Sequence, residues 1–127
     1  MTDSDGWKMI DRRLIRFFRK HHVLTIATSV SNEPWCANCF YVYLEEENAL
    51  VFTTGIETRH GKEFAKNALV AGSVVLETMV IGKIRGIQFQ GIVSEPEGEM
   101  ISKDYSTLTI NSLRGIDIFN CLSSKGE

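Results

Sequence analysis

The residues best suited to chemistry lie where an apolar, strand-like run ends in hydroxyls, with a guanidinium and an imidazole following before the next helix. The set comprises Thr53, Thr54, Thr58, Arg59 and His60. Hydroxyl and N–H groups form directional hydrogen bonds to an anion, and a guanidinium adds charged donors. A helix beginning near Thr58 would add the positive end of its dipole. The pattern predicts a phosphate site. The alternative is an ordinary strand–turn–helix junction capped by Thr58.

A second candidate surface is the segment 84–91, in which glutamine alternates with apolar residues. Alternate side chains of a strand share a face, so Gln88 and Gln90 would present amides on a flat surface. Amides can donate and accept at the edge of a heteroaromatic ring. Gly91, among apolar positions, indicates a bulge or a close backbone approach. The alternative is a solvated outer face of an antiparallel sheet.

The pair Cys36 and Cys39 has the C-x-x-C spacing of redox and zinc sites. Redox pairs of this kind begin at a helix N-terminus, and structural zinc needs a second pair of ligands. Here the motif lies in a predicted strand, where residues three apart point to opposite faces. We therefore expect small, buried or half-buried strand side chains and neither a redox nor a metal site.

Composition limits the classes of protein to consider. The chain has 127 residues, of which 43% are hydrophobic and 24% charged, as expected for one soluble globular domain. No apolar run approaches the roughly 20 residues of a membrane span, and the acidic N-terminus is unlike a secretory signal. A net charge of −2 gives no overall attraction to nucleic acid or acidic membranes, so neither is the expected partner, and a local basic patch stays open. Three cysteines without an export signal indicate reduced thiols and a cytoplasmic location.

The elements that position these residues follow from hydrophobic periodicity. Helical spacing predicts an amphipathic helix from Trp7 to about His22, with a basic opposite face. β-Branched and alternating segments predict strands over 23–28, 35–43, 49–53, 70–77 and 85–93. The remaining expectations are turns at 31–34 and 45–48, helices at 63–68 and 98–113, and a short, partly frayed tail at 114–127. Short strands with little helical alternation predict a mainly β fold, an antiparallel barrel with peripheral helices.

Several of these segments, taken in order, resemble the pyridoxamine-phosphate-oxidase-like, FMN-binding split-barrel family, and most closely a short, poorly characterised bacterial branch of it. The segments are W-C-A-N at 35–38, T-R-H at 58–60 and R-G-I-Q-F-Q-G at 85–91. The resemblance covers roughly residues 10 to 100. It rests on the order and spacing of the motifs, and it implies a split β-barrel forming one domain over 1–127.

The resemblance implies FMN as the cofactor and assigns roles to residues. The phosphate would be bound by Thr53, Thr54, Thr58, Arg59 and His60. The isoalloxazine ring would lie along the strand that holds Asn38, Cys39 and Phe40, with Gln88 as a further contact. Many members have lysine where this chain has His60, and histidine keeps a donor without a fixed charge at neutral pH. Members form two-fold dimers, so the resemblance also implies a homodimer with a flavin site at each end of the interface.

The function implied is that of a flavin-dependent oxidoreductase acting on an unidentified small molecule. Two departures argue against pyridoxamine phosphate oxidation itself. No arginine–x–histidine element follows Arg114, and the usual C-terminal strand is expected to be missing or very short. Two alternatives stay open. One is a non-catalytic binding module for haem or a deazaflavin. The other is a cofactor-free interaction protein that uses the basic helix face at Arg12, Arg16 and Arg19.

Overall fold

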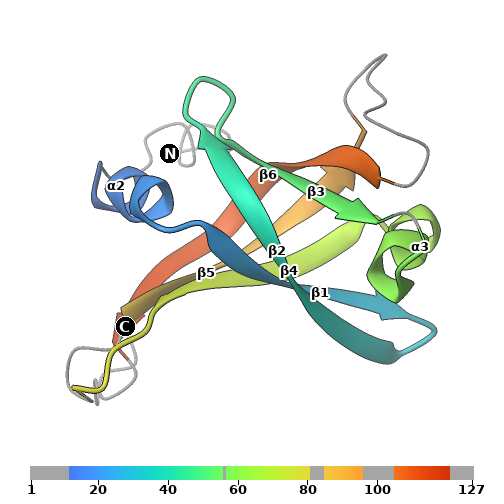
Figure 1. Cartoon of the computed structure of the whole chain (residues 1–127), viewed down its shortest axis with the longest axis horizontal. Coiled ribbons are helices and arrows are strands. Elements are labelled where there is room, and N and C mark those ends of the chain that lie inside the picture. The colour runs from blue at the N-terminus through green and yellow to red at the C-terminus, as the bar shows by residue number, and fades with distance from the viewer. Residues whose placement is uncertain (1–11, 56, 81–84, 96–104, 121–127) are drawn as a thin grey trace.

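The computed structural model describes residues 12–55, 57–80, 85–95 and 105–120. Six antiparallel strands close into a barrel in the order β1-β2-β3-β6-β5-β4, which confirms the predicted fold class. The strands are β1 (Val23–Val30), β2 (Glu33–Leu44), β3 (Ala49–Gly55), β4 (Leu69–Leu76), β5 (Arg85–Ser94) and β6 (Tyr105–Asn120). The helices are α2 (Arg12–Lys20) and α3 (Arg59–Lys66). Figure 1 shows them at opposite ends of the barrel. Within the described residues, no helix is long and apolar enough to cross a membrane.

The first two strands form a hairpin joined at Ser31 and Asn32. Both residues have positive φ, 54° and 68°, as a type I′ turn requires. Glu33 and Pro34, which were predicted to belong to the turn, are the first residues of β2. The twist of such a turn matches that of its strands, and β1 pairs along its whole length with the first eight residues of β2, from Val30–Glu33 to Val23–Phe40.

Strand β6 is the largest departure from the sequence-based expectation. The helix predicted at 98–113 is wrong where it can be compared, because residues 105–120 form one strand of 16 residues; residues 98–104 lie outside the described part. The expected loss of the C-terminal strand and the frayed tail are also wrong for 114–120, which continue β6. The physical reason is pairing. β6 supplies backbone partners to both β3 and β5, and Leu108 and Ile110 alternate into the core.

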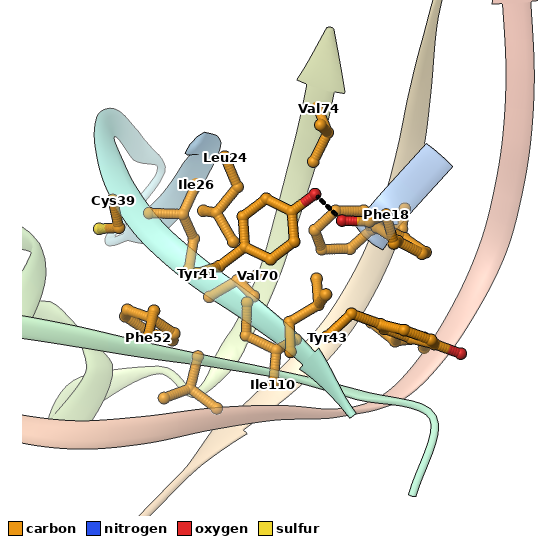
Figure 2. Packing of buried hydrophobic residues seen from close by; sticks show 14 of the residues in the cluster. Phe18, Leu24, Ile26, Cys39, Tyr41, Tyr43, Phe52, Val70, Val74 and Ile110 are labelled. Carbon is orange, nitrogen blue, oxygen red and sulfur yellow. Dashed lines mark hydrogen bonds between the residues drawn. The ribbon is translucent and has the colours of Figure 1, made fainter. Parts of the chain in front are cut away.

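The barrel interior is filled from the strands and closed at one end by α2. Phe18 of α2 is fully buried and stacks on Tyr43, with ring centroids 5.0 Å apart. The Tyr41 hydroxyl donates a 2.7 Å hydrogen bond to the Phe18 carbonyl, which satisfies a buried polar group where the helix meets β2 (Figure 2). Helix α2 thus packs on this end of the barrel, and α3, which carries Arg59 and His60, lies at the other end.

Gly91 permits close packing between β5 and β6. A Cβ atom at this position would lie 2.4 Å from Ile110 Cγ2, closer than real Cβ contacts come. The β5–β6 register also shifts on either side of Gln90. The expectation of a bulge or close backbone approach at Gly91 is confirmed. Along the same strand, Ile87, Phe89 and Val93 face inward while Gln88, Gln90 and Ile92 face outward, as the alternation predicted.

Candidate functional site

Helix α3 begins directly after Thr58, at the end of β3. Thr58 has extended backbone angles, φ −72° and ψ 159°, and its hydroxyl accepts the Gly61 N–H at 3.1 Å. The same hydroxyl donates to the Gly55 carbonyl at 2.7 Å. Thr58 is therefore the N-cap of α3, as the alternative interpretation of this junction stated. Because its hydrogen is used locally, Thr58 serves chiefly to fix the start of the helix.

His60 faces the barrel interior and joins a small polar group, here called the His60 cluster, made up of Cys39, Thr54, Thr58 and His60. Its Nε2 atom lies 2.5 Å from Thr54 Oγ1, 3.4 Å from Thr58 Oγ1 and 3.9 Å from Cys39 Sγ. Burial lowers the pKa of His60, against a smaller opposing effect of the Glu63 charge. Burial also raises the pKa of the Cys39 thiol. The cluster is thus neutral at neutral pH and offers hydrogen bonds without charge.

Arg59 points away from the His60 cluster and lies over the ring of Trp35, with 4.2 Å from its Cζ to the ring centroid. Its Nε donates to Glu63 Oε2 at 2.9 Å, one helical turn along α3. Its Nη2 lies 3.8 Å from Glu33 Oε1, a longer ion pair. The Arg59 side chain remains 44% exposed. Its charge therefore sits at the surface near the first turn of α3.

Glu63, beneath Arg59, is a functional candidate that the sequence reasoning missed. It is only 8% exposed, and its Oε1 accepts a 2.5 Å hydrogen bond from the buried Thr28 hydroxyl. The bonds from Thr28 and then from Arg59 lower the pKa of the Glu63 carboxyl. The i, i+4 spacing of Arg59 and Glu63 was a readable signal. The contacts with Thr28 and Trp35 depend on how the helix docks on β1 and β2.

The outer face of the sheet carries the residues predicted to contact a ring. Asn38, exposed on β2, accepts a 2.8 Å hydrogen bond from Thr25 Oγ1. The strand register places Asn38 opposite Thr25, Thr25 opposite Ser73, and Ser73 opposite Gln88, so these four residues form one polar row. With neighbouring strands about 4.8 Å apart, Asn38 and Gln88 are separated by about 14 Å along the sheet. One ring edge could not be bonded by both from the same chain.

The structure therefore divides the predicted site residues into groups. Cys39, Thr54, Thr58 and His60 come together inside the barrel end. Phe40 and Thr53 are exposed on the outer face, as are Asn38 and Gln88, and Arg59 occupies a separate position over Trp35. Adjacent strand residues point to opposite faces of the sheet. Thr53 and Thr54 therefore lie on different faces, and so does Cys39 relative to Asn38 and Phe40.

The two described cysteines point to different faces of β2, as the strand argument predicted, but the expectation that both are at least half-buried is wrong for Cys36. Cys36 is exposed and Cys39 is buried, both as free thiols on β2. Their sulfurs therefore lie on different faces of the strand. Over the described ranges, no group of three or more His, Cys, Asp or Glu side chains is placed to bind a metal ion.

A pocket of about 450 Å³ opens beside Thr54 and α3. It is lined by Thr54, Gly61, Lys62, Phe64, Ala65, Val93, Ser94, Glu95 and Leu108. Its walls combine apolar side chains with hydroxyls and one charge of each sign. Such a lining suits a small organic molecule with a polar end.

Apolar side chains gather on the outer face of β1, β2 and β4. Phe40 is 65% exposed, and its cross-strand partner Val23 is 54% exposed. Val42 and Val75, on the neighbouring parts of the same face, are also exposed. We call these four residues the apolar outer face. His22 stacks on Phe40 at 5.7 Å between ring centroids.

Comparison with known sequences finds relatives among uncharacterised bacterial proteins. The chain is 44% identical over 99 residues to a UPF0306 protein of Photorhabdus laumondii, a match that covers 78% of this chain and 66% of the relative. The chain spans just under two thirds of the length of the curated relatives it matches. No family model matches the sequence.

Comparison with solved structures finds the same fold at low sequence identity. A candidate pyridoxamine 5′-phosphate oxidase of Listeria innocua has a TM-score of 0.71 at 15% identity, covering 86% of this chain and 97% of that one. An FAD-binding protein of Mesorhizobium loti has a TM-score of 0.70 at 11% identity, covering 87% and 94%. The haem storage protein HutZ of Vibrio cholerae has a TM-score of 0.72 at 12% identity, covering 85% and 93%. At these identities the likeness establishes the fold.

Proposed function

We propose that this chain, which has the split-barrel fold of the pyridoxamine 5′-phosphate oxidase-like proteins, binds FMN and acts as a flavin-dependent oxidoreductase on a small molecule. The observation that carries the proposal is the start of α3. There the exposed Arg59 guanidinium, an N-capped first turn and the end of β3 converge. The fold is shared with flavin- and haem-binding proteins, and phosphate is the flavin group that this donor set suits.

The phosphate would meet Arg59 and the first turn of α3. The Nε atom of Arg59 is bonded to Glu63, which leaves its Nη groups toward solvent as donors for phosphate oxygens. The donor set fits a dianion because it combines a charged fork with the positive end of a helix dipole. In this proposal His60 does not take the role of the lysine that many members of the resembled family have at this position. It supports Thr54 from inside the barrel and contributes no positive charge at neutral pH.

The ring would lie on the outer face of β2, near Asn38 and Phe40. Both side chains are exposed there, while Cys39 points inward and cannot touch a ring on that face. The separation of Asn38 from Gln88 across the sheet requires that Gln88 act on a different part of the ligand or in the second site of a dimer.

A homodimer is part of the same proposal. The apolar outer face, Val23, Phe40, Val42 and Val75, exposes large side chains next to the polar row. Contiguous apolar surface of this kind commonly marks an interface, and a two-fold pair of identical chains would cover it on both copies. Each flavin would then lie between two chains, and the second chain would shield from water the face of the ring that the first chain leaves exposed.

A bound flavin supplies the electron transfer, so the polypeptide needs to bind and orient it. Arg59 would hold the phosphate, and Asn38 would present its amide to the ring edge. The free thiols of Cys36 and Cys39 accord with the cytoplasm as the compartment.

The absorbance spectrum of purified protein, before and after incubation with FMN and desalting, tests the proposal. The expected result is that each chain retains one flavin, with absorbance bands at about 375 and 450 nm. A haem band in the purified protein would instead favour a haem-binding module. A colourless protein that releases all added FMN would rule the flavin function out.

A further inference from the structure

Glu63 is a buried carboxylate to which the proposed function assigns no contact with the ligand. Burying a carboxylate is costly unless hydrogen bonds compensate for the lost water. Here both oxygens are bonded: Oε1 accepts from the Thr28 hydroxyl at 2.5 Å, and Oε2 accepts from Arg59 Nε at 2.9 Å. Thr28 is itself buried, on β1. A carboxylate held at both oxygens by two different elements has one orientation, and it can transmit that orientation to whatever it binds.

The group that Glu63 orients is the Arg59 guanidinium. Glu63 accepts a hydrogen bond from Arg59 Nε, and the centroid of the Trp35 ring lies 4.2 Å from Arg59 Cζ. Trp35 is the cross-strand partner of Thr28, so the ring and the hydroxyl belong to one rigid pair of strands. With one edge and one face fixed, the Nη groups remain at the exposed side of the guanidinium. The ion pair of Arg59 with Glu33, at 3.8 Å, lies beyond hydrogen-bonding distance and adds little restraint.

We propose that Glu63 is a positioning residue that holds Arg59 with its Nη groups set to receive the phosphate of a bound nucleotide. An arginine side chain loses conformational entropy when it binds a ligand, and fixing it beforehand lowers that cost. Partners of ligand-binding residues act in the same way around metal sites. The inference rests on the proposed FMN function and names a residue of that site which never touches the ligand.

The charge of Glu63 and its position beside Arg59 predict opposite effects of a substitution on FMN affinity, so the proposal can be tested. Removing a negative charge near an anion site strengthens anion binding by Coulomb attraction alone. Removing the residue that orients Arg59 weakens it. Glu63→Leu removes the charge and both hydrogen bonds, whereas Glu63→Asp keeps the charge and shortens the side chain. Glu57→Gln is the matched control, because Glu57 is an exposed carboxylate near the same helix start that pairs with Lys62 at 3.4 Å.

The experiment measures dissociation constants for FMN and for riboflavin, which lacks the phosphate, by flavin fluorescence at fixed ionic strength. We expect both Glu63 variants to bind FMN about three- to tenfold more weakly while riboflavin affinity is unchanged. Glu57→Gln should leave FMN affinity unchanged or raise it. Circular dichroism melts establish that each variant is folded. Trp35→Leu changes an exposed side chain and leaves the buried carboxylate in place, and we expect it to weaken FMN binding in the same way.

The possible failures are distinguishable. Wild-type protein that binds neither flavin would overturn the proposed function, and the role of Glu63 with it. If wild-type protein binds FMN more tightly than riboflavin and folded Glu63→Asp shows the same ratio of the two dissociation constants, the positioning role is overturned. The flavin function is then left intact. Tighter FMN binding by Glu63→Leu would show that the charge of Glu63 matters and its geometry does not. An unchanged ratio in Trp35→Leu would overturn the fixed orientation of Arg59.

Discussion

His60 and Thr54 are joined at 2.5 Å between Nε2 and Oγ1, across the gap between α3 and β3. The contact ties the first turn of the helix to the inside of the barrel. Since the imidazole is partly buried and its pKa is lowered, the contact is made by the neutral ring. Stability at this end of the barrel should therefore depend on pH.

The free energy of unfolding should fall as the pH drops below about 6.5, the ordinary pKa of histidine. The unfolded chain protonates His60 at that pH, whereas the folded protein resists protonation because its pKa is lower. The unfolded state thus binds more protons, and stability is lost toward acid. Urea unfolding at pH 7.5 and 5.5 should show a smaller loss for His60→Gln than for wild type. The lowered pKa of His21 is common to both proteins and cancels in the difference. Equal losses would exclude His60 as the origin.

Replacing Arg59 should weaken FMN binding selectively. Arg59→Ala is expected to cost about 1.5–3 kcal/mol of FMN binding free energy, the range for a hydrogen bond to a charged group, and to leave riboflavin binding unchanged. Isothermal titration of both ligands measures this. Arg16→Ala is the matched control, because Arg16 is exposed on α2 at the other end of the barrel. An FMN dissociation constant unchanged by Arg59→Ala would remove Arg59 from the site.

Adding one methyl group at Gly91 should destabilise the barrel. The new Cβ would overlap Ile110 Cγ2, and relief requires movement of β6 against β5. We expect Gly91→Ala to lower the free energy of unfolding by about 1–3 kcal/mol, measured by urea denaturation. Gln90→Ala, on the exposed face of the same strand, should change it by less than about 0.5 kcal/mol. If the two variants proved equally stable, β5 and β6 would not be packed as closely as described.

Charge on the apolar outer face should separate the proposed dimer. Val42→Glu places a carboxylate among exposed apolar side chains, where a second copy would have to bury it. Sedimentation velocity should show the mass of a dimer for wild type and of a monomer for the variant. Ala65→Glu, on the exposed side of α3, adds the same charge elsewhere and should leave the dimer intact. A wild-type monomer at micromolar concentration would contradict the dimer itself.

The sequence predicted the first part of the barrel well because its signals are local. Alternation along β5 identified its inward and outward residues, and Ser31-Asn32 identified the hairpin turn. Part of β6 was misread as a helix that ended at residue 113, and Ser112, with positive φ, interrupts the alternation in that part. What makes the segment a strand is pairing with the edges of β5, the preceding strand, and of β3, which is distant in sequence.

The sequence singled out residues for the candidate site without showing how they are arranged. Successive helix residues differ by about 100° in direction, so Arg59 and His60 had to diverge once α3 began after Thr58. That geometry could have been read from the sequence. The partners that receive the two side chains, Trp35 for one and Thr54 for the other, could not, because they depend on how α3 docks against the barrel.

The pairing of β6 with both β3 and β5 has a consequence for biosynthesis. β6 follows all the other described strands in sequence, so it leaves the ribosome after them. Until it does, β3 and β5 each expose an unpaired edge, the kind of edge that recruits other chains. The pairs that then close the barrel are distant in sequence, such as Phe52 with Leu108, and such contacts form slowly. The nascent chain should therefore depend on chaperones, or on slow translation, until residues 105–120 have been made.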